Sequence, residues 1–235
     1  MSAVTHHFGV NLLKCLSAIP RLRCLRLAIA GIHFKVDAIS LVHDHIWDNT
    51  SLVLHRALKN YLKDGDCVLD LGTGHIGLLA IYCSKIRQIK VLAVDVNPEF
   101  IENARVVALA SQAQEIEFRQ SDWFSNVDGH FDLIFGNVPY IPTEVGETTL
   151  YSHDHPEIWD GGFDGLNPAR TVLKEVPKYL NDHGVLLLGL DAAFVSDLAM
   201  TKLIEDSKEL ELQKIIRSWI SSSEVFVIGP RRYVH

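Results

Sequence analysis

The chain has 235 residues, 48% of them apolar, and a formal net charge of -7. This length and composition suffice for one substantial hydrophobic core with a short appendage. The acidic balance argues against a protein that holds duplex nucleic acid mainly through phosphate contacts. The four cysteines form no C-x-x-C pair and the histidines show no metal-ligand spacing, so we expect a cytoplasmic protein without a metal site.

The first 45 residues are basic and apolar, and we expect them to form a lid or substrate-binding segment. Residues 10–34 are rich in leucine and isoleucine, but Lys14, Pro20 and Arg21 interrupt them. A transmembrane helix needs about 20 predominantly apolar residues, so this stretch does not qualify. Residues 27–39 alternate as a strand or hairpin. We therefore divide the chain into a helical or hairpin segment, residues 1–45, and a main domain, residues 46–235.

A polar cluster begins the main domain. Asp48, Asn49, Thr50 or Ser51 can cap a helix whose apolar positions recur every three or four residues up to Leu62. We expect this helix to be structural.

The next stretch, CVLDLGTGHIGLLAI, reads as a buried strand, a tight turn and a helix. Gly72, Gly74 and Gly77 allow backbone amides to approach a ligand closely at the start of that helix. They fit G-x-G-x-x-G, and Asp95 lies at the spacing of a ribose-binding acid, which favours a nicotinamide or flavin dinucleotide. Asp70 favours S-adenosylmethionine instead, because its carboxylate repels a pyrophosphate and attracts a cationic amino group. A glycine turn that binds nothing is the third interpretation.

A regular alternation of strands and helices follows. Four further strands are predicted at residues 90–95, 115–120, 131–137 and 184–191, with a helix that begins at Pro98. Residues 210–219 and 224–230 favour an antiparallel pair at one edge. The spacing predicts an α/β fold with a doubly wound, Rossmann-like sheet of seven strands, mostly parallel.

Ligands of such sheets bind at the carboxyl ends of the strands, and the first four predicted strands all end in polar residues. Asp95 can accept hydrogen bonds from both hydroxyls of a ribose, although it can also cap the helix that follows. Asp122 can accept from the amine of adenine, with Trp123 against the ring.

The fourth strand ends in GNVPYIP, residues 136–142. If a neutral nitrogen attacks a sulfonium methyl group, positive charge develops on that nitrogen. The Asn137 side-chain oxygen and the Val138 carbonyl are acceptors suited to stabilise it. Tyr140 can pack on a planar amide or ring and orient it. The structural alternative is a proline-aromatic turn that only ends a strand.

These segments, read with DLGTG and AVDVNPEFIENAR, resemble class I S-adenosylmethionine-dependent methyltransferases, most closely the HemK/PrmC type. That family methylates the glutamine side chain in the GGQ motif of peptide-chain release factors. The likeness implies that Asp70, Gly72 and Gly74 hold the methionine end, Asp95 the ribose, and Asp122 with Trp123 the adenine. The full set of implied cofactor contacts is Asp70, Gly72, Thr73, Gly74, Asp95, Val96, Asp122, Trp123 and Asn137. The implied catalytic set is Asn137, Val138, Pro139 and Tyr140.

Three departures separate this chain from the family pattern. Val138 replaces the first proline of Asn-Pro-Pro-Tyr, the third glycine is out of register, and residues 1–45 stand where the family has a helical domain. The resemblance therefore predicts an N-methyltransferase that acts on a protein glutamine or on a small molecule. Three alternatives stay open: an NAD-dependent oxidoreductase, a non-catalytic partner protein, and a nucleic-acid base methyltransferase, which the acidic charge disfavours. Asp154, Glu157 and Asp160 can assist substrate recognition or simply form a solvated acidic loop.

Overall fold

The structure is a computed structural model, and it describes residues 48–148 and 155–232. The predicted N-terminal lid, its hairpin and Asp154 lie outside these residues. The helices are α3 (Asn49–Tyr61), α4 (Leu78–Ile86), α5 (Pro98–Ala110), α6 (Thr143–Glu147), α7 (Pro156–Trp159), α8 (Asn167–Glu175) and α9 (Asp197–Glu205), with a 3-10 turn at Val176–Lys178. The strands are β1 (Cys67–Leu71), β2 (Lys90–Asp95), β3 (Ile116–Gln120), β4 (Phe131–Asn137), β5 (Leu180–Asp191), β6 (Leu210–Arg217) and β7 (Ser223–Pro230).

The seven strands form one sheet in the order β3-β2-β1-β4-β5-β7-β6, as predicted for an α/β doubly wound fold. Strands β1 to β5 pair in parallel, and β7 pairs antiparallel with both β5 and β6. The fifth strand begins at Leu180 rather than at Gly184, because an irregularity lets Leu180 pair with Phe131 ahead of the main register. The predicted antiparallel pair is confirmed, and β7 lies inside the sheet while β6 forms its edge.

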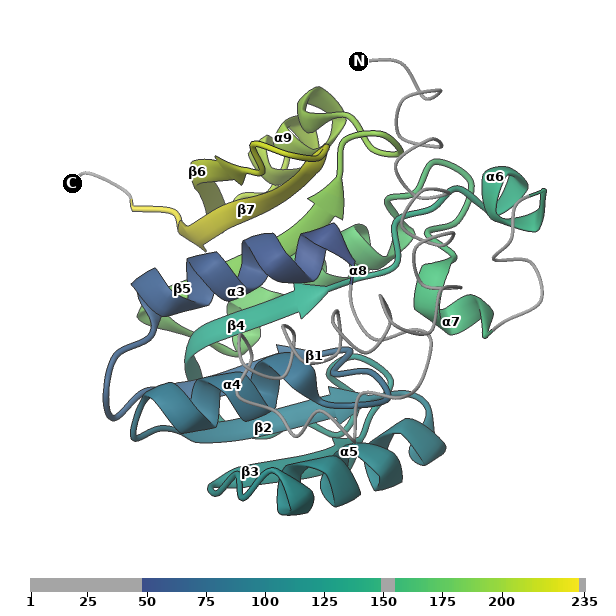
Figure 1. Ribbon diagram of the computed structural model, residues 1–235. Helices are drawn as coiled ribbons and strands as arrows, with labels where there is room; N and C mark the ends of the chain where they lie inside the picture. The colour runs from purple at the N-terminus through teal and green to yellow at the C-terminus, as the bar shows by residue number, and fades with distance from the viewer. Residues whose placement is uncertain (1–47, 149–154, 233–235) are drawn as a thin grey trace.

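Helices cover both faces of the sheet. Figure 1 shows α3, α4 and α5 side by side on one face, with α8 and α9 behind the sheet. Two separate apolar cores fill these layers, one around Leu54, Ile81 and Ile101, the other around Val172 and Met200. Burial of both faces explains why β1 and β5 read as continuous apolar runs. None of the helices in residues 48–148 and 155–232 is long and apolar enough to cross a membrane.

Helix α3 begins as the sequence predicts, and Asp48 is its cap. The Asp48 carboxylate accepts a hydrogen bond from the backbone N–H of Ser51 at 2.8 Å. The buried residues of the helix, which include Leu54 and Leu58, pack against β5 and β7. The amino end of α3 therefore lies at the carboxyl edge of the sheet, beside the end of β4.

Candidate active site

The glycine turn after β1 is built against the neighbouring strand. The backbone N–H groups of Gly72 and Thr73 both donate to the carbonyl oxygen of Val94 at 2.9 Å. Gly72 and Gly74 have φ values of +73° and +69°, a region that residues with a Cβ rarely adopt. A Cβ at either position would have no described atom within 4 Å. The turn therefore presents bare backbone to open space, as close approach of a ligand requires.

Asp95 lies at the end of β2, and its side chain is buried with 8% exposure. One carboxylate oxygen accepts from the N–H of Gly74 at 2.9 Å, and the other accepts from the N–H of Asn97 at 3.0 Å. Burial raises the pKa of Asp95, and these two hydrogen bonds oppose that rise. The cap of α5 is Asn97, not Asp95, because the Asn97 side chain accepts from the N–H of Glu99. Asp95 thus holds the glycine turn against β2.

Asp70 lies beneath the turn at 3% exposure. Burial raises its pKa from 3.8 to about 7, against the hydrogen bonds that it accepts from the Thr73 hydroxyl and the backbone of Ala80. The Thr73 hydroxyl lies 2.7 Å from the carboxylate. Since Ala80 belongs to the first turn of α4, Asp70 faces the positive end of that helix. The charge of Asp70 therefore changes near neutral pH.

The end of β3 brings Asp122 and Trp123 to the same edge. Ser121 links them to β2 by donating its N–H to the Asp95 carbonyl at 2.9 Å. Its hydroxyl donates to the Trp123 carbonyl at 2.8 Å. Asp122 is exposed and Trp123 is half-buried with a φ of +49°. A positive φ at a bulky residue costs about 1–3 kcal/mol, so the surrounding bonds hold this loop in a strained form.

The end of β4 carries the predicted catalytic residues. Val138 is buried, whereas Asn137, Pro139 and Tyr140 are half-buried. The side-chain amide of Asn137 donates to Asp48 at 3.1 Å and to Ser51 at 3.3 Å. Its side-chain oxygen is buried and accepts no hydrogen bond from the described residues. Buried polar atoms are almost always paired in native proteins, so this acceptor is available to a ligand.

The Tyr140 hydroxyl donates to the second Asp48 carboxylate oxygen at 3.0 Å. The hydroxyl of Thr50 lies 3.2 Å from the same oxygen of Tyr140. Burial raises the pKa of Tyr140 well above its usual 10.0, and the nearby charges of Asp48 and Asp191 raise it further. Tyr140 therefore stays protonated and acts as a donor at neutral pH.

Sequence reasoning treated Asp48 only as a candidate helix cap and missed its contacts with Asn137 and Tyr140. These partners are 89 and 92 residues away in the chain. The one sequence signal for these contacts is that Asp48 can cap a helix that packs on the sheet. The sequence does not show how α3 packs, and that packing brings Asp48 to the end of β4.

The predicted catalytic loop, residues 137–142, packs against the segment that contains α7 and the glycines after it. Ile141 and Asp160 form an isolated bridge, with the Ile141 N–H donating to Trp159 and the Gly161 N–H donating back to Ile141. Gly165 lies so close that a Cβ there would be 2.5 Å from the Tyr140 carbonyl oxygen. The glycine-rich stretch DGGFDG, residues 160–165, thus fixes the backbone of Tyr140.

The two described acids of the acidic segment make structural contacts. Asp160 accepts from the Thr143 hydroxyl at 2.7 Å and from the Gly162 N–H at 2.9 Å. Glu157 accepts from the Asn97 side chain at 3.1 Å, which places α7 beside the end of β2. Figure 1 shows α6 and α7 at the side toward which the β4 arrow points.

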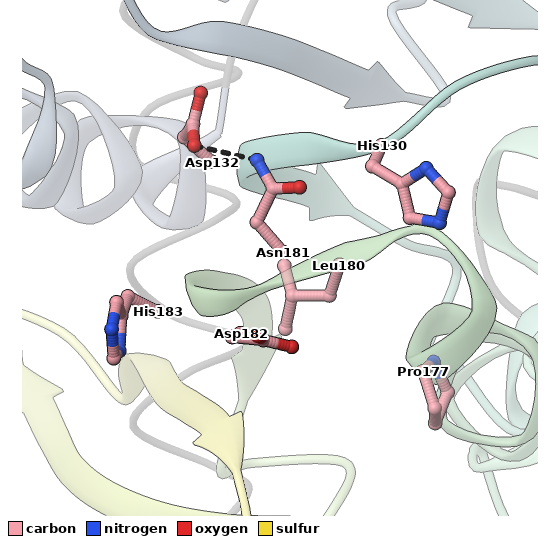
Figure 2. A pocket seen from close by; sticks show the side chains of 7 residues that line it. All are labelled: His130, Asp132, Pro177, Leu180, Asn181, Asp182 and His183. Carbon is pink, nitrogen blue, oxygen red and sulfur yellow. Dashed lines mark hydrogen bonds between the residues drawn. The ribbon is translucent and has the colours of Figure 1, made fainter.

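A pocket of about 550 Å³ lies at the opposite edge, between the amino ends of β4 and β5 (Figure 2). Its lining contains His130, Asp132, Asn181 and His183, but none of the predicted site residues. Asp132 accepts from Asn181 at 2.6 Å and from the Cys67 N–H at 2.9 Å, so it joins β1, β4 and β5. The polar contacts of Asp132 in this pocket are therefore structural.

The predicted site residues form a row at the carboxyl edge, because their strands are neighbours in the order β3-β2-β1-β4. Along this row lie Asp122 and Trp123, then Asp95, then Asp70 with the glycines, and finally Asn137 with Tyr140. Adjacent strands are about 4.8 Å apart, so the row spans about 14 Å.

Known proteins resemble this chain in sequence and in fold. Residues 38–152 match the methyltransferase small domain. A putative protein N5-glutamine methyltransferase of Methanocaldococcus jannaschii is 34% identical over 68% of this chain and 76% of the relative. The release factor glutamine methyltransferase of Streptococcus pneumoniae is 32% identical over 67% of this chain, and the match spans only 56% of that longer protein. A methyltransferase structure from Pyrococcus furiosus covers 86% of this chain, with 92% of its own length aligned, at a TM-score of 0.63 and 23% identity.

The sheet and the row of residues at its carboxyl edge thus define a class I S-adenosylmethionine-dependent methyltransferase. Within that class, the chain belongs to the HemK/PrmC-type family. The family decides between the two ligands that the glycine turn left open, in favour of S-adenosylmethionine over a nicotinamide dinucleotide.

The residues present fit this cofactor. The glycine turn offers bare backbone, and the buried carboxylates of Asp70 and Asp95 lie beside it at the ends of β1 and β2. At the end of β4, the Asn137 side-chain oxygen accepts no hydrogen bond from the described residues. When bound, S-adenosylmethionine supplies an electrophilic methyl group on a positively charged sulfur.

Proposed function

We propose that this enzyme transfers a methyl group to the side-chain amide nitrogen of a protein glutamine. The observation that carries the proposal is the buried side-chain oxygen of Asn137, which accepts no hydrogen bond from residues 48–148 or 155–232. An amide nitrogen that attacks a methyl group becomes positively charged, and an acceptor aimed at its hydrogens stabilises that charge. Asn137 and the carbonyl of Val138 are the acceptors that we assign to this task.

The order of residues along the sheet edge supports the assignment of the cofactor contacts. We place adenine against Asp122 and Trp123, the ribose at Asp95, and the methionine end at Asp70, Gly72, Thr73 and Gly74, with Val96 beside the ribose. Adenine, ribose and sulfonium follow one another in the same order in the cofactor. The methyl group would then lie next to Asn137, at the end of the row of predicted site residues.

A protein substrate is favoured over a small molecule by the names of the two relatives, a protein N5-glutamine methyltransferase and a release factor glutamine methyltransferase. Since the match spans 56% of the Streptococcus relative, the rest of that protein is no guide to what this chain contacts. A cytoplasmic location and the lack of a duplex nucleic-acid partner remain predictions.

The test is incubation of the purified chain with methyl-labelled S-adenosylmethionine and a release factor of the same organism. We expect label in the factor and no label when the GGQ glutamine is replaced by alanine. A parallel incubation with a cell extract separates macromolecules from small solutes. Label in a new small molecule other than the cofactor, with none in the macromolecules, would contradict the proposal and favour a biosynthetic N-methyltransferase.

A further inference from the structure

Asp48 is the one described residue that contacts both polar side chains of the catalytic loop. One carboxylate oxygen accepts from the Asn137 amide at 3.1 Å and from the Ser51 N–H at 2.8 Å. The other accepts from the Tyr140 hydroxyl at 3.0 Å. Three donors from two elements therefore converge on one carboxylate.

The chemistry of a carboxylate decides which way the Asn137 amide points. An ionised carboxylate only accepts hydrogen bonds, so the NH₂ group of Asn137 must face Asp48. The side-chain oxygen of Asn137 then faces away from Asp48, where it is buried and accepts no bond from the described residues. With the amide reversed, the Asn137 oxygen would face the Asp48 carboxylate, and two acceptors would meet. The Asn137 NH₂ group would then face the substrate nitrogen that receives the methyl group.

The same carboxylate joins two parts of the fold that the chain does not connect locally. Asp48 caps α3, while Asn137 is the last residue of β4 and Tyr140 follows that strand. The catalytic loop has Val138 where the family has its first proline, so its backbone lacks one fixed φ angle. A clamp from α3 supplies restraint from outside the loop.

We propose that Asp48 is a positioning residue that holds Asn137 with its oxygen toward the acceptor nitrogen and Tyr140 in its packing orientation. This inference deepens the proposed function and rests on it for its kinetic consequence. The carboxylate acts through Asn137 and Tyr140, because its own hydrogen bonds all go to the protein.

Variants at Asp48 separate this role from helix capping. In Asp48→Ser the residue still caps α3, since serine and aspartate are comparable N-caps, but the single short oxygen does not reach Asn137 and Tyr140. In Asp48→Asn the cap and the acceptor for Asn137 remain, and only the Tyr140 contact is altered. We expect Asp48→Ser to lose 10- to 100-fold in kcat with an unchanged Kd for S-adenosylhomocysteine and an unchanged melting temperature. Asp48→Asn should recover most of the rate.

Ser196→Ala is the matched control. It removes the side chain that caps α9 by accepting from Ala199 at 3.2 Å, and it has no contact with the catalytic loop. We expect lower thermal stability with an unchanged kcat. If Asp48→Ser kept the wild-type kcat, or behaved like the control by losing stability while keeping its rate, Asp48 would be a cap alone.

A readout that needs no methyl acceptor distinguishes the failure of this inference from the failure of the proposed function. The Asn137 side-chain NH₂ resonance in a ¹⁵N-labelled sample is identified by its absence from Asn137→Ala. We expect a shifted, slowly exchanging pair of protons in the wild type, and values of a free amide in Asp48→Ser. Free-amide values in the wild type would overturn the clamp, whatever the enzyme methylates. A shifted pair without release-factor methylation would leave the clamp standing and reject the substrate.

Discussion

The backbone N–H of Gly74 donates to the carboxylate of Asp95 over 2.9 Å, so the turn after β1 and the end of β2 form one unit. The bond joins residues that are 21 positions apart. It leaves each carboxylate oxygen with a further lone pair for a ligand, because an ionised carboxylate offers about four acceptor sites.

Replacement of Asp95 by asparagine should weaken cofactor binding. Asparagine has one acceptor oxygen in place of two, so it cannot accept from both Gly74 and Asn97 and still serve a ribose diol. We expect the Kd for S-adenosylhomocysteine to rise at least tenfold, as measured by isothermal titration calorimetry. Asp128→Asn is the control, since Asp128 pairs with Arg119 on the surface. Equal affinities for the two variants would contradict the assignment of Asp95.

Replacement of Asn137 by alanine tests the role in methyl transfer that we assign to its side-chain oxygen. Loss of one acceptor aimed at a developing charge costs about 10²- to 10³-fold in rate by analogy with oxyanion-hole donors. We expect that loss in kcat, with cofactor affinity within about threefold of wild type by calorimetry. A variant that retained full methylation would remove Asn137 from the catalytic set.

Asp70 should make the stability of the ligand-free protein depend on pH. Its folded pKa, about 7, lies above the unfolded value of 3.8, so the folded state binds the extra proton between these values. Stability from this group is fully present below pH 3.8 and is lost as the pH rises through 7, with a total of about 4 kcal/mol. Asp70→Asn should therefore gain stability relative to wild type in urea unfolding at pH 8, and gain less than half as much at pH 5. A constant difference across this range would contradict the raised pKa.

Cofactor binding should respond to the same titration with the opposite sign. The cationic amino group of S-adenosylhomocysteine favours the ionised form of Asp70, so we expect its affinity to rise between pH 6 and pH 8. Calorimetry at several pH values measures this slope. In Asp70→Asn the slope should be smaller; a slope that is equal in both proteins would place the methionine amino group elsewhere.

Gly165→Ala should disturb the catalytic loop. A Cβ at this φ of +78° would lie 2.5 Å from the Tyr140 carbonyl oxygen and 2.8 Å from Val195. Gly129→Ala is a matched control, because Gly129 has a φ of +88° but no described atom within 4 Å of its Cβ position. We expect the control to lose about 1–2 kcal/mol from backbone strain alone. Gly165→Ala should lose more, together with at least tenfold in kcat, as measured by urea unfolding and methyl transfer.

Sequence reasoning predicted most of the fold because local patterns carry it. The strand ends at Asp95 and Asn137 and the helix start at Pro98 follow from apolar runs and a proline at the first helical position. Local patterns could not predict that β7 lies between β5 and β6. The orders β5-β7-β6 and β5-β6-β7 give the same alternation of residues along each strand. The start of β5 at Leu180 depends on a local break in register.

The sequence also predicted only part of the candidate site. Residues at strand ends could be named, because parallel strands bring their carboxyl ends to one edge. The Asp48 contacts could not, because they join residues about 90 positions apart and depend on the seating of α3. The close contact between Gly165 and the Tyr140 carbonyl likewise depends on tertiary packing. It arises only when residues 160–165 pack against the loop after β4.

The position of β7 also constrains how the chain acquires its structure during synthesis. Strand β6 leaves the ribosome before β7, yet within the described part of the chain its only partner in the sheet is β7. The edge of β5 stays unpaired over the same interval, because β7 is its neighbour as well. Among the described strands, β7 therefore emerges last and pairs with two neighbours at once. Shortening the chain before Ser223 would expose a nascent β5 edge and leave β6 without a partner, which predicts aggregation rather than a smaller folded enzyme.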